Sequence, residues 1–152
     1  PLLKLAISLD DPEHNDQMIF GPKKTVAVGE TSQPDTAVIQ QTLGKEFNAS
    51  ATTTGLMKLE AVHGQRSDQV ADVSGTVTMT GLQPPLPPQF TTKEGSFKVV
   101  LGGSIPATRH GLRKETLASN MHFVSEAAGP NAATMVITID GLNKSATVLV
   151  FP

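Results

Sequence analysis

The stretch that decides the fold class is residues 135–151, which read MVITIDGLNKSATVLVF. Two runs rich in β-branched residues, 135–139 and 146–151, flank the tetrapeptide DGLN at residues 140–143. An Asp-Gly pair between two such runs is a strong hairpin signal, because glycine adopts the positive φ that tight turns require. The stretch therefore predicts a C-terminal β-hairpin that packs in the core. We expect five of its residues to be mostly buried: Val136, Ile137, Ile139, Val148 and Val150.

Alternation of apolar and polar residues, the period of a half-buried strand, recurs at residues 3–9, 56–62 and 70–82. Residues 32–44 differ, because a cap candidate, an early proline and a terminal glycine flank spaced apolar positions, which predicts one short helix. The Gly-Gly pair at residues 102–103 reads as a break between strands. About nine short strands follow from these patterns. The predicted fold class is all-β, or β-rich with one short helix, arranged as an antiparallel β-sandwich or a strongly curved sheet.

The composition fits a single domain spanning residues 1–152. Hydrophobic residues make up 38% of the chain and charged residues 17%, and disorder would require a higher charge content than this. The formal net charge of −2 provides no overall basic field to attract nucleic acid. The absence of cysteine excludes disulfides, thiolate metal sites and cysteine nucleophiles. No run of 18 apolar residues occurs, so we expect no membrane partner.

The sequence contains no recognisable catalytic constellation. The densest acidic cluster, residues 10–16, could ligate calcium, but it lacks the positional pattern of an EF-hand and is interpreted as a solvated turn. No G-x-S-x-G elbow and no phosphate-binding glycine loop occurs, and the four histidines are scattered. We therefore expect a protein that is not an enzyme, with no catalytic residue, metal or cofactor.

A proline-rich segment at residues 83–89 is the first candidate contact region. Four of its seven positions are proline, which cannot donate a ladder hydrogen bond and favours polyproline II. The segment therefore predicts an exposed connection or arm that can lie on a neighbouring subunit. The candidate subunit contacts are Pro84, Pro85, Leu86, Pro87 and Pro88.

The second candidate region is the basic stretch that holds Arg109, Arg113 and Lys114. It is the place where cations crowd, so it could contact a polyanion or an acidic partner. No aromatic side chain lies nearby to stack on bases, and the alternative interpretation is a solvated loop. Nucleic acid is thus a candidate partner only through this local patch.

Together these features favour a self-assembling structural protein. Strands with mixed faces, the proline-rich arm and an apolar last strand all offer surfaces to partners. The composition resembles that of phage and virus structural proteins, so we expect a virion subunit, either a capsid coat or a decoration protein, that forms a homo-oligomer or binds other virion proteins. Pro1 is a residue behind which an initiator Met is usually removed, which favours synthesis in the host cytoplasm.

Two alternatives remain open at the level of sequence. The first is a secreted or extracellular immunoglobulin-like module for adhesion or ligand binding. Its sugar-binding version is disfavoured, because such sites use exposed Trp or Tyr and the chain has neither. The second is a small β-barrel hydrolase or metal enzyme.

Overall fold

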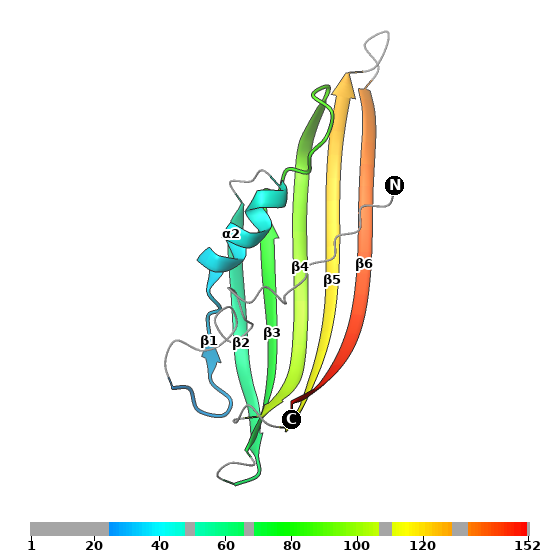
Figure 1. Ribbon diagram of the computed structural model, residues 1–152. Coiled ribbons are helices and arrows are strands. Elements are labelled where there is room, and N and C mark those ends of the chain that lie inside the picture. The colour runs from blue at the N-terminus through cyan, green and yellow to red at the C-terminus, as the bar shows by residue number, and fades with distance from the viewer. Residues whose placement is uncertain (1–24, 48–50, 66–68, 107–110, 129–133, 152) are drawn as a thin grey trace.

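The computed structural model describes residues 25–47, 51–65, 69–106, 111–128 and 134–151 of the 152-residue chain. These residues form one curved antiparallel β-sheet with a helix against one of its faces (Figure 1). The β-rich class with one short helix is therefore confirmed, in the form of a curved sheet. The sheet order is β1-β2-β3-β4-β5-β6, so strands that are neighbours in the sequence are also neighbours in the sheet. The strands are β1 (Thr31–Ser32), β2 (Thr52–His63), β3 (Val70–Thr80), β4 (Phe90–Pro106), β5 (Gly111–Ala128) and β6 (Thr134–Phe151).

The predicted helix is present as α2 (Thr36–Phe47). Asp35 caps it, because its Oδ1 accepts a hydrogen bond from Val38 N at 3.3 Å, the pattern that joins an N-cap residue to the third helical position. Gln40 donates from Nε2 to Ala51 O at 2.9 Å, which ties the helix to the start of β2. We call the face of the sheet that α2 covers the inner face, and the opposite one the outer face.

The core lies between α2 and the inner face. The alternation of β3 decides which of its side chains enter this layer: Val77 and Met79 are buried, while Thr76 and Thr78 on the outer face are not. Each large apolar side chain buried here stabilises the fold by roughly 1.5–3 kcal/mol. The buried cluster comprises Ile39, Ala51, Val77, Met79, Leu82, Phe97, Val99 and Phe123.

The predicted C-terminal hairpin is wrong. Residues 135–151 belong to one continuous strand, β6, which pairs in antiparallel register with β5 along its whole length. In the middle of this ladder Asp140 pairs with His122 and Gly141 with Met121. Gly141 has no positive φ. Because a two-residue hairpin of this type needs positive φ at both central residues, the Asp-Gly pair makes no turn and the strand continues through it.

The predicted break at the Gly-Gly pair is also wrong. β4 continues through Gly102 and Gly103, which pair with β3 on one side and β5 on the other. A Cβ on Gly103 would overlap the carbonyl oxygen of Lys114 in β5. Glycine at this position therefore allows two backbones to approach closely, and it does not end the strand.

The burial predicted for the C-terminal stretch fails with the hairpin. Val136, Ile139 and Val148 are exposed, with 55%, 44% and 59% of their surface accessible, and Ile137 is half-buried. The side chain of Val150 lies outside the described residues. The buried cluster under α2 is built on β3, β4 and β5, so β6 lies beyond it.

Two further sequence predictions cannot be placed. The strand expected at residues 3–9 and the acidic turn at residues 10–16 both lie outside the described residues.

Candidate interaction surface

β6 forms one edge of the sheet, and within the described part of the chain no strand pairs with its far side. The strand has 18 residues, which corresponds to about 60 Å of extended backbone. None of these residues is proline, so each carries a backbone N–H. Such an edge can act as a template for another strand, because its outward N–H and C=O groups have no ladder partner. We call this row of backbone groups and its flanking side chains, residues 134–151, the β6 edge.

The opposite side of the sheet is built differently. There β1 pairs with β2 over Thr31↔Lys58 and Ser32↔Met57, and Gly29 N donates to Leu59 O at 2.7 Å. The backbone of residues 29–32 therefore pairs with the middle of β2 and covers this part of the edge. The two edges of the sheet are thus unequal, and the β6 edge is the longer open one among the described residues.

The side chains of the β6 edge alternate in a simple pattern on the outer face. Val136, Leu142 and Val148 are apolar and exposed, and Leu142 is 69% accessible. Asp140 and Lys144 lie between them and are the two charged residues of the strand. From residue 136 to 148 the outer face of β6 therefore carries an apolar, an acidic, an apolar, a basic and an apolar residue in this order, with Thr138 and Ala146 as the small residues between them.

Asp140 is held by a histidine of the neighbouring strand. His122 donates from Nδ1 to Asp140 Oδ1 at 2.6 Å, and its Nε2 lies 3.8 Å from Glu94 Oε2. The hydrogen bond to Asp140 is the main cause that raises the pKa of His122, with a further contribution from the charge of Glu94, while partial burial acts in the opposite direction. The Asp140 side chain stays 69% accessible, so it can accept a second partner from outside the sheet.

A second polar cluster on the outer face joins a Ser, a His and an Asp. Ser104 Oγ donates to Asp72 Oδ1 at 2.6 Å, and His63 Nε2 donates to Asp72 Oδ2 at 2.7 Å. These two bonds, that of Ser104 first, hold the pKa of Asp72 below its usual value. In a hydrolase triad the histidine lies between the other two, whereas here both bonds go to the carboxylate. This geometry does not place a base on the serine.

The neighbouring Glu60 is held in the same way. It occupies a β-bulge between Leu59 and Ala61, where it accepts bonds from Lys58 Nζ and Ser74 Oγ, both at 2.6 Å. These bonds, that from Lys58 first, lower the pKa of Glu60. Across the described residues, no group of three metal-ligating side chains comes together.

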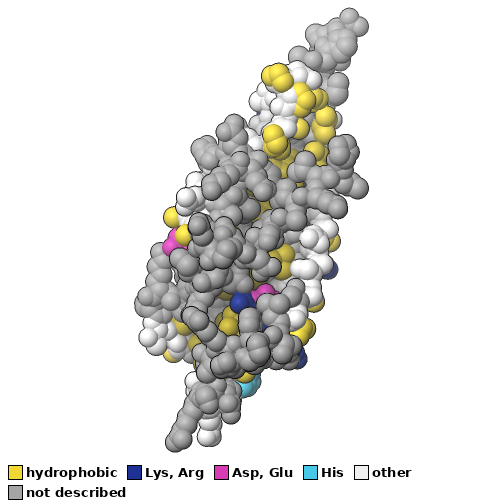
Figure 2. Space-filling model, viewed as in Figure 1, with side chains coloured by type: hydrophobic (Ala, Val, Ile, Leu, Met, Phe, Trp, Pro, Cys, Tyr) yellow, Lys and Arg dark blue, Asp and Glu magenta, His cyan; other side chains and the backbone are white. Residues whose placement is uncertain are grey.

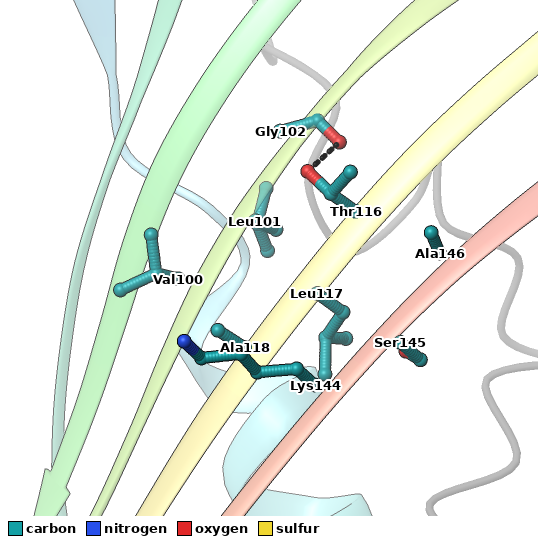
Figure 3. A pocket seen from close by; sticks show the side chains of 9 residues that line it. All are labelled: Val100, Leu101, Gly102, Thr116, Leu117, Ala118, Lys144, Ser145 and Ala146. Carbon is teal, nitrogen blue, oxygen red and sulfur yellow. Dashed lines mark hydrogen bonds between the residues drawn. The ribbon is translucent and has the colours of Figure 1, made fainter.

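A shallow, open hollow lies where β4, β5 and β6 run side by side (Figure 3). Thr116 Oγ1 donates to Gly102 O at 3.2 Å, and the side chain of Lys144 runs across Ala118 towards β4. Lys144 is the ionisable residue among the described residues that line the hollow, so this place offers no pair of acid and base. The remaining lining residues are Val100, Leu101, Leu117, Ser145 and Ala146.

The proline-rich segment connects β3 to β4. Leu86 N donates to Pro84 O at 2.8 Å and Phe90 N donates to Pro87 O at 2.9 Å, which makes two tight local turns. Pro85, Pro87 and Pro88 are exposed, and Pro84 and Leu86 are half-buried. Figure 2 shows apolar side chains gathered at this end of the sheet. The five candidate contacts therefore stay together on one connection, and their role between subunits stays a prediction.

The structure divides the basic stretch. Arg113 and Lys114 are consecutive residues of β5, so their side chains project to opposite faces of the sheet. Arg113 forms an ion pair with Glu115, whereas Lys114 is exposed. Arg109 lies outside the described residues. Contact with a polyanion stays a prediction, and within the described residues Lys114 is the candidate on the outer face.

Comparison with known proteins gives no further guide, since no protein-family model, curated protein or solved structure matches the chain. With 12 residues, α2 is shorter than the roughly 20 apolar residues that a bilayer-spanning helix needs, and the described residues contain no other helix that could span one.

Sequence reasoning did not identify the β6 edge or its two charges as a site. The hairpin prediction placed Asp140 in a turn and left Lys144 in the loop that followed it. No local signal separates one strand from two here, because apolar residues occupy both parities: Ile137 and Ile139 stand at odd positions, and Val136, Leu142 and Val148 at even ones.

Proposed function

We propose that this protein is a non-enzymatic structural subunit that assembles with copies of itself, as the coat or decoration proteins of a virion do. The observation that carries the proposal is the β6 edge, a long open strand with exposed apolar side chains. Soluble proteins usually shorten, cover or charge such an edge, because it invites pairing with another chain. A subunit that must join its neighbours has a use for it.

Further apolar exposure on the outer face supports the same proposal. Leu56 on β2 and Val100 on β4 are both exposed on this face, and Val62, which the β-bulge of β2 turns to the inner face, is exposed as well, so β2 has the mixed faces that the sequence predicts. Leu56 and Val100 lie opposite the same residue, Thr76, on either side of β3. Exposed apolar residues that gather in one region are typical of surfaces that contact partners, whereas isolated ones are ordinary. In an assembly the outer face and the proline-rich connection would provide contacts additional to those of the β6 edge.

Native mass spectrometry with negative-stain imaging of the purified protein tests the proposal. We expect defined oligomers, rings or particles in place of a monomer of 16.0 kDa. A monomer at every concentration up to the solubility limit would contradict self-assembly and would favour the extracellular binding module instead.

A further inference from the structure

We infer that two copies of the chain pair antiparallel through their β6 edges, around a two-fold axis at Leu142, so that two sheets become one. This inference rests on the proposed self-assembly and specifies one of its contacts. It needs no rearrangement of the described backbone, since strand addition uses the outward backbone groups of an existing edge. The Lys144 side chain, which in the single chain runs across Ala118 towards β4, turns to the edge to meet its partner.

The symmetry of the pairing fixes which side chains can face each other. A two-fold axis perpendicular to the sheet keeps the outer face of one copy next to the outer face of the other. Residues that lie opposite each other in an antiparallel ladder share a face, so even-numbered residues of β6 must meet even-numbered residues. The register of the pair can therefore change only in steps of two residues, and each step moves the two-fold axis by one residue.

With Leu142 on the axis, the two charges of the strand become partners. Asp140 of one copy lies opposite Lys144 of the second copy, and the symmetry repeats this ion pair on the other side of the axis. Opposite charges directly across an antiparallel pair stabilise it, and like charges destabilise it. The accessible carboxylate of Asp140 keeps room for this second partner beside His122.

The same register matches the apolar residues. Val136 lies opposite Val148 of the second copy, and Leu142 lies opposite Leu142. Among the described side chains, these are the three large hydrophobic residues of the outer face of β6 that are exposed in the single chain. All three thus gain an apolar neighbour in one step, with Thr138 opposite Ala146 between them.

The two neighbouring registers lose this match. With Gly141 on the axis, Asp140 faces Leu142 and Lys144 faces Thr138. With Asn143 on the axis, Asp140 faces Ala146 and Lys144 faces Leu142. Both place a charge opposite an apolar side chain and leave the ion pair unmade. The self-complementary order of apolar, acidic, apolar, basic and apolar residues is the reason to assign a second copy, and no other strand, to this edge.

Charge reversal tests the register directly. In Asp140→Lys the pair becomes two Lys–Lys contacts, and in Lys144→Asp it becomes two Asp–Asp contacts, so each variant alone should self-associate at least about tenfold more weakly than wild type. An equimolar mixture of the two variants restores opposite charges at both positions. Sedimentation velocity should therefore show association in the mixture at concentrations where each variant alone is dissociated.

Two controls separate the register from general effects of charge and folding. Lys98→Asp makes the same charge change on the outer face of β4, away from the edge, and should form the β6-paired dimer like wild type, even if contacts of the outer face in a larger assembly are weakened. The double variant D140K/K144D exchanges the two charges within one strand and should pair with itself. If Asp140→Lys fails to fold by circular dichroism because His122 loses its carboxylate partner, Lys144→Asp decides the case: association as strong as that of wild type would contradict the register.

The outcomes distinguish this inference from the proposed function. If wild type associates and both single variants associate as strongly, the β6 pairing is wrong while self-assembly stands. If each variant is weakened but neither the mixture nor the double variant recovers, the Asp140–Lys144 register is wrong. If wild type is a monomer throughout, both the inference and the proposed function fail.

Discussion

Gly95 shows how tightly the backbone is packed where β3 leaves the sheet and β4 enters it. Leu82 N donates to Gly95 O at 3.2 Å, and a Cβ on Gly95 would overlap the carbonyl oxygen of Leu82. The side chain of Leu82 is fully buried, so its backbone oxygen cannot shift without disturbing the core. The reason for glycine here is space, since Gly95 has no positive φ.

We therefore expect Gly95→Ala to destabilise the fold by about 1–3 kcal/mol through overpacking. The control is Gly141→Ala, whose Cβ would meet Met121 Cβ at 3.8 Å, an ordinary contact, and which should change stability by less than about 0.5 kcal/mol. Urea denaturation of the two variants and wild type provides the measurement. Equal stability of the two alanine variants would show that the carbonyl of Leu82 can give way.

At the residue scale, sequence reasoning misjudged the core for an identifiable reason. Val136 and Val148 have the same residue type as Val77, and alternation alone does not distinguish an edge strand from a central one. What separates them is the place of the strand in the sheet: β3 lies between β2 and β4 and faces α2, while β6 has one neighbouring strand among the described residues. Position in the sheet is a long-range property that a local pattern does not contain.

At the scale of elements, the helix was predictable and the C-terminal strand was not. The signals for α2 are local, because Asp35 caps its own helix within four residues. The alternative to a turn at Asp140 depends on a distant segment, since His122 holds the Asp140 side chain from 18 positions away. A full-length partner strand thus overrides a turn signal that is strong in isolation. The polar network around Asp72 was missed for the same reason, because His63 and Ser104 come from different strands.

The link between β5 and β6 through His122 predicts a pH dependence of stability. Its pKa is raised in the folded state, first by the hydrogen bond to Asp140, so protonated His122 is favoured by folding. The stabilisation is fully present at pH values below the pKa of histidine in the unfolded chain, about 6.5. It is lost as the pH rises through the pKa of His122 in the folded chain. The two acidic groups that face the ring are Glu94 from β4 and Asp140 from β6.

The measurement compares the unfolding free energy of wild type and His122→Gln at pH 5.5 and pH 8.5. At pH 5.5 we expect wild type to have a larger unfolding free energy than His122→Gln. This difference between the two proteins should shrink at pH 8.5. The subtraction removes the contributions of groups that the substitution leaves unchanged, Asp72 among them. A difference that stays constant between the two pH values would mean that the ring does not gain its proton on folding.

The proline-rich connection makes its own prediction at this scale. Leu86 is half-buried and lies in a segment whose prolines limit its freedom, so little entropy is lost when a partner immobilises it. If the connection contacts another subunit, Leu86→Asp should weaken assembly while the unfolding transition stays nearly unchanged. The contrasting variant is Leu82→Asp, which buries a charge at a fully buried site and should unfold the protein.

Sedimentation of Leu86→Asp and wild type at matched concentration decides this point. Equal yields of oligomer would remove the connection from the interface. A variant that no longer folds would instead place Leu86 in the core of its own chain.

At the scale of the whole molecule, one helix covers part of one face of a broad sheet. The buried cluster is centred on β3, β4 and the inner face below α2, whereas large exposed apolar residues lie on both faces of β2 and β6 and on the outer face of β4. Pairing at the β6 edge would make the outermost strand of each sheet an inner strand of a larger one, which removes the asymmetry between the two edges.

Such a shared sheet couples unfolding to dissociation, and the coupling is measurable. When two folded copies separate on unfolding, the midpoint temperature rises with protein concentration by mass action. For a pair of 152-residue chains with an unfolding enthalpy of roughly 0.7 kcal/mol per residue, the expected rise is about 2 °C for each tenfold increase. Differential scanning calorimetry of wild type over a hundredfold range, where the dimer is populated, should show this trend, and Lys144→Asp should show it only weakly. A wild-type midpoint that stays constant over that range would mean that the sheet of one copy is stable without the other, and the β6 edge would then be no part of the folding unit.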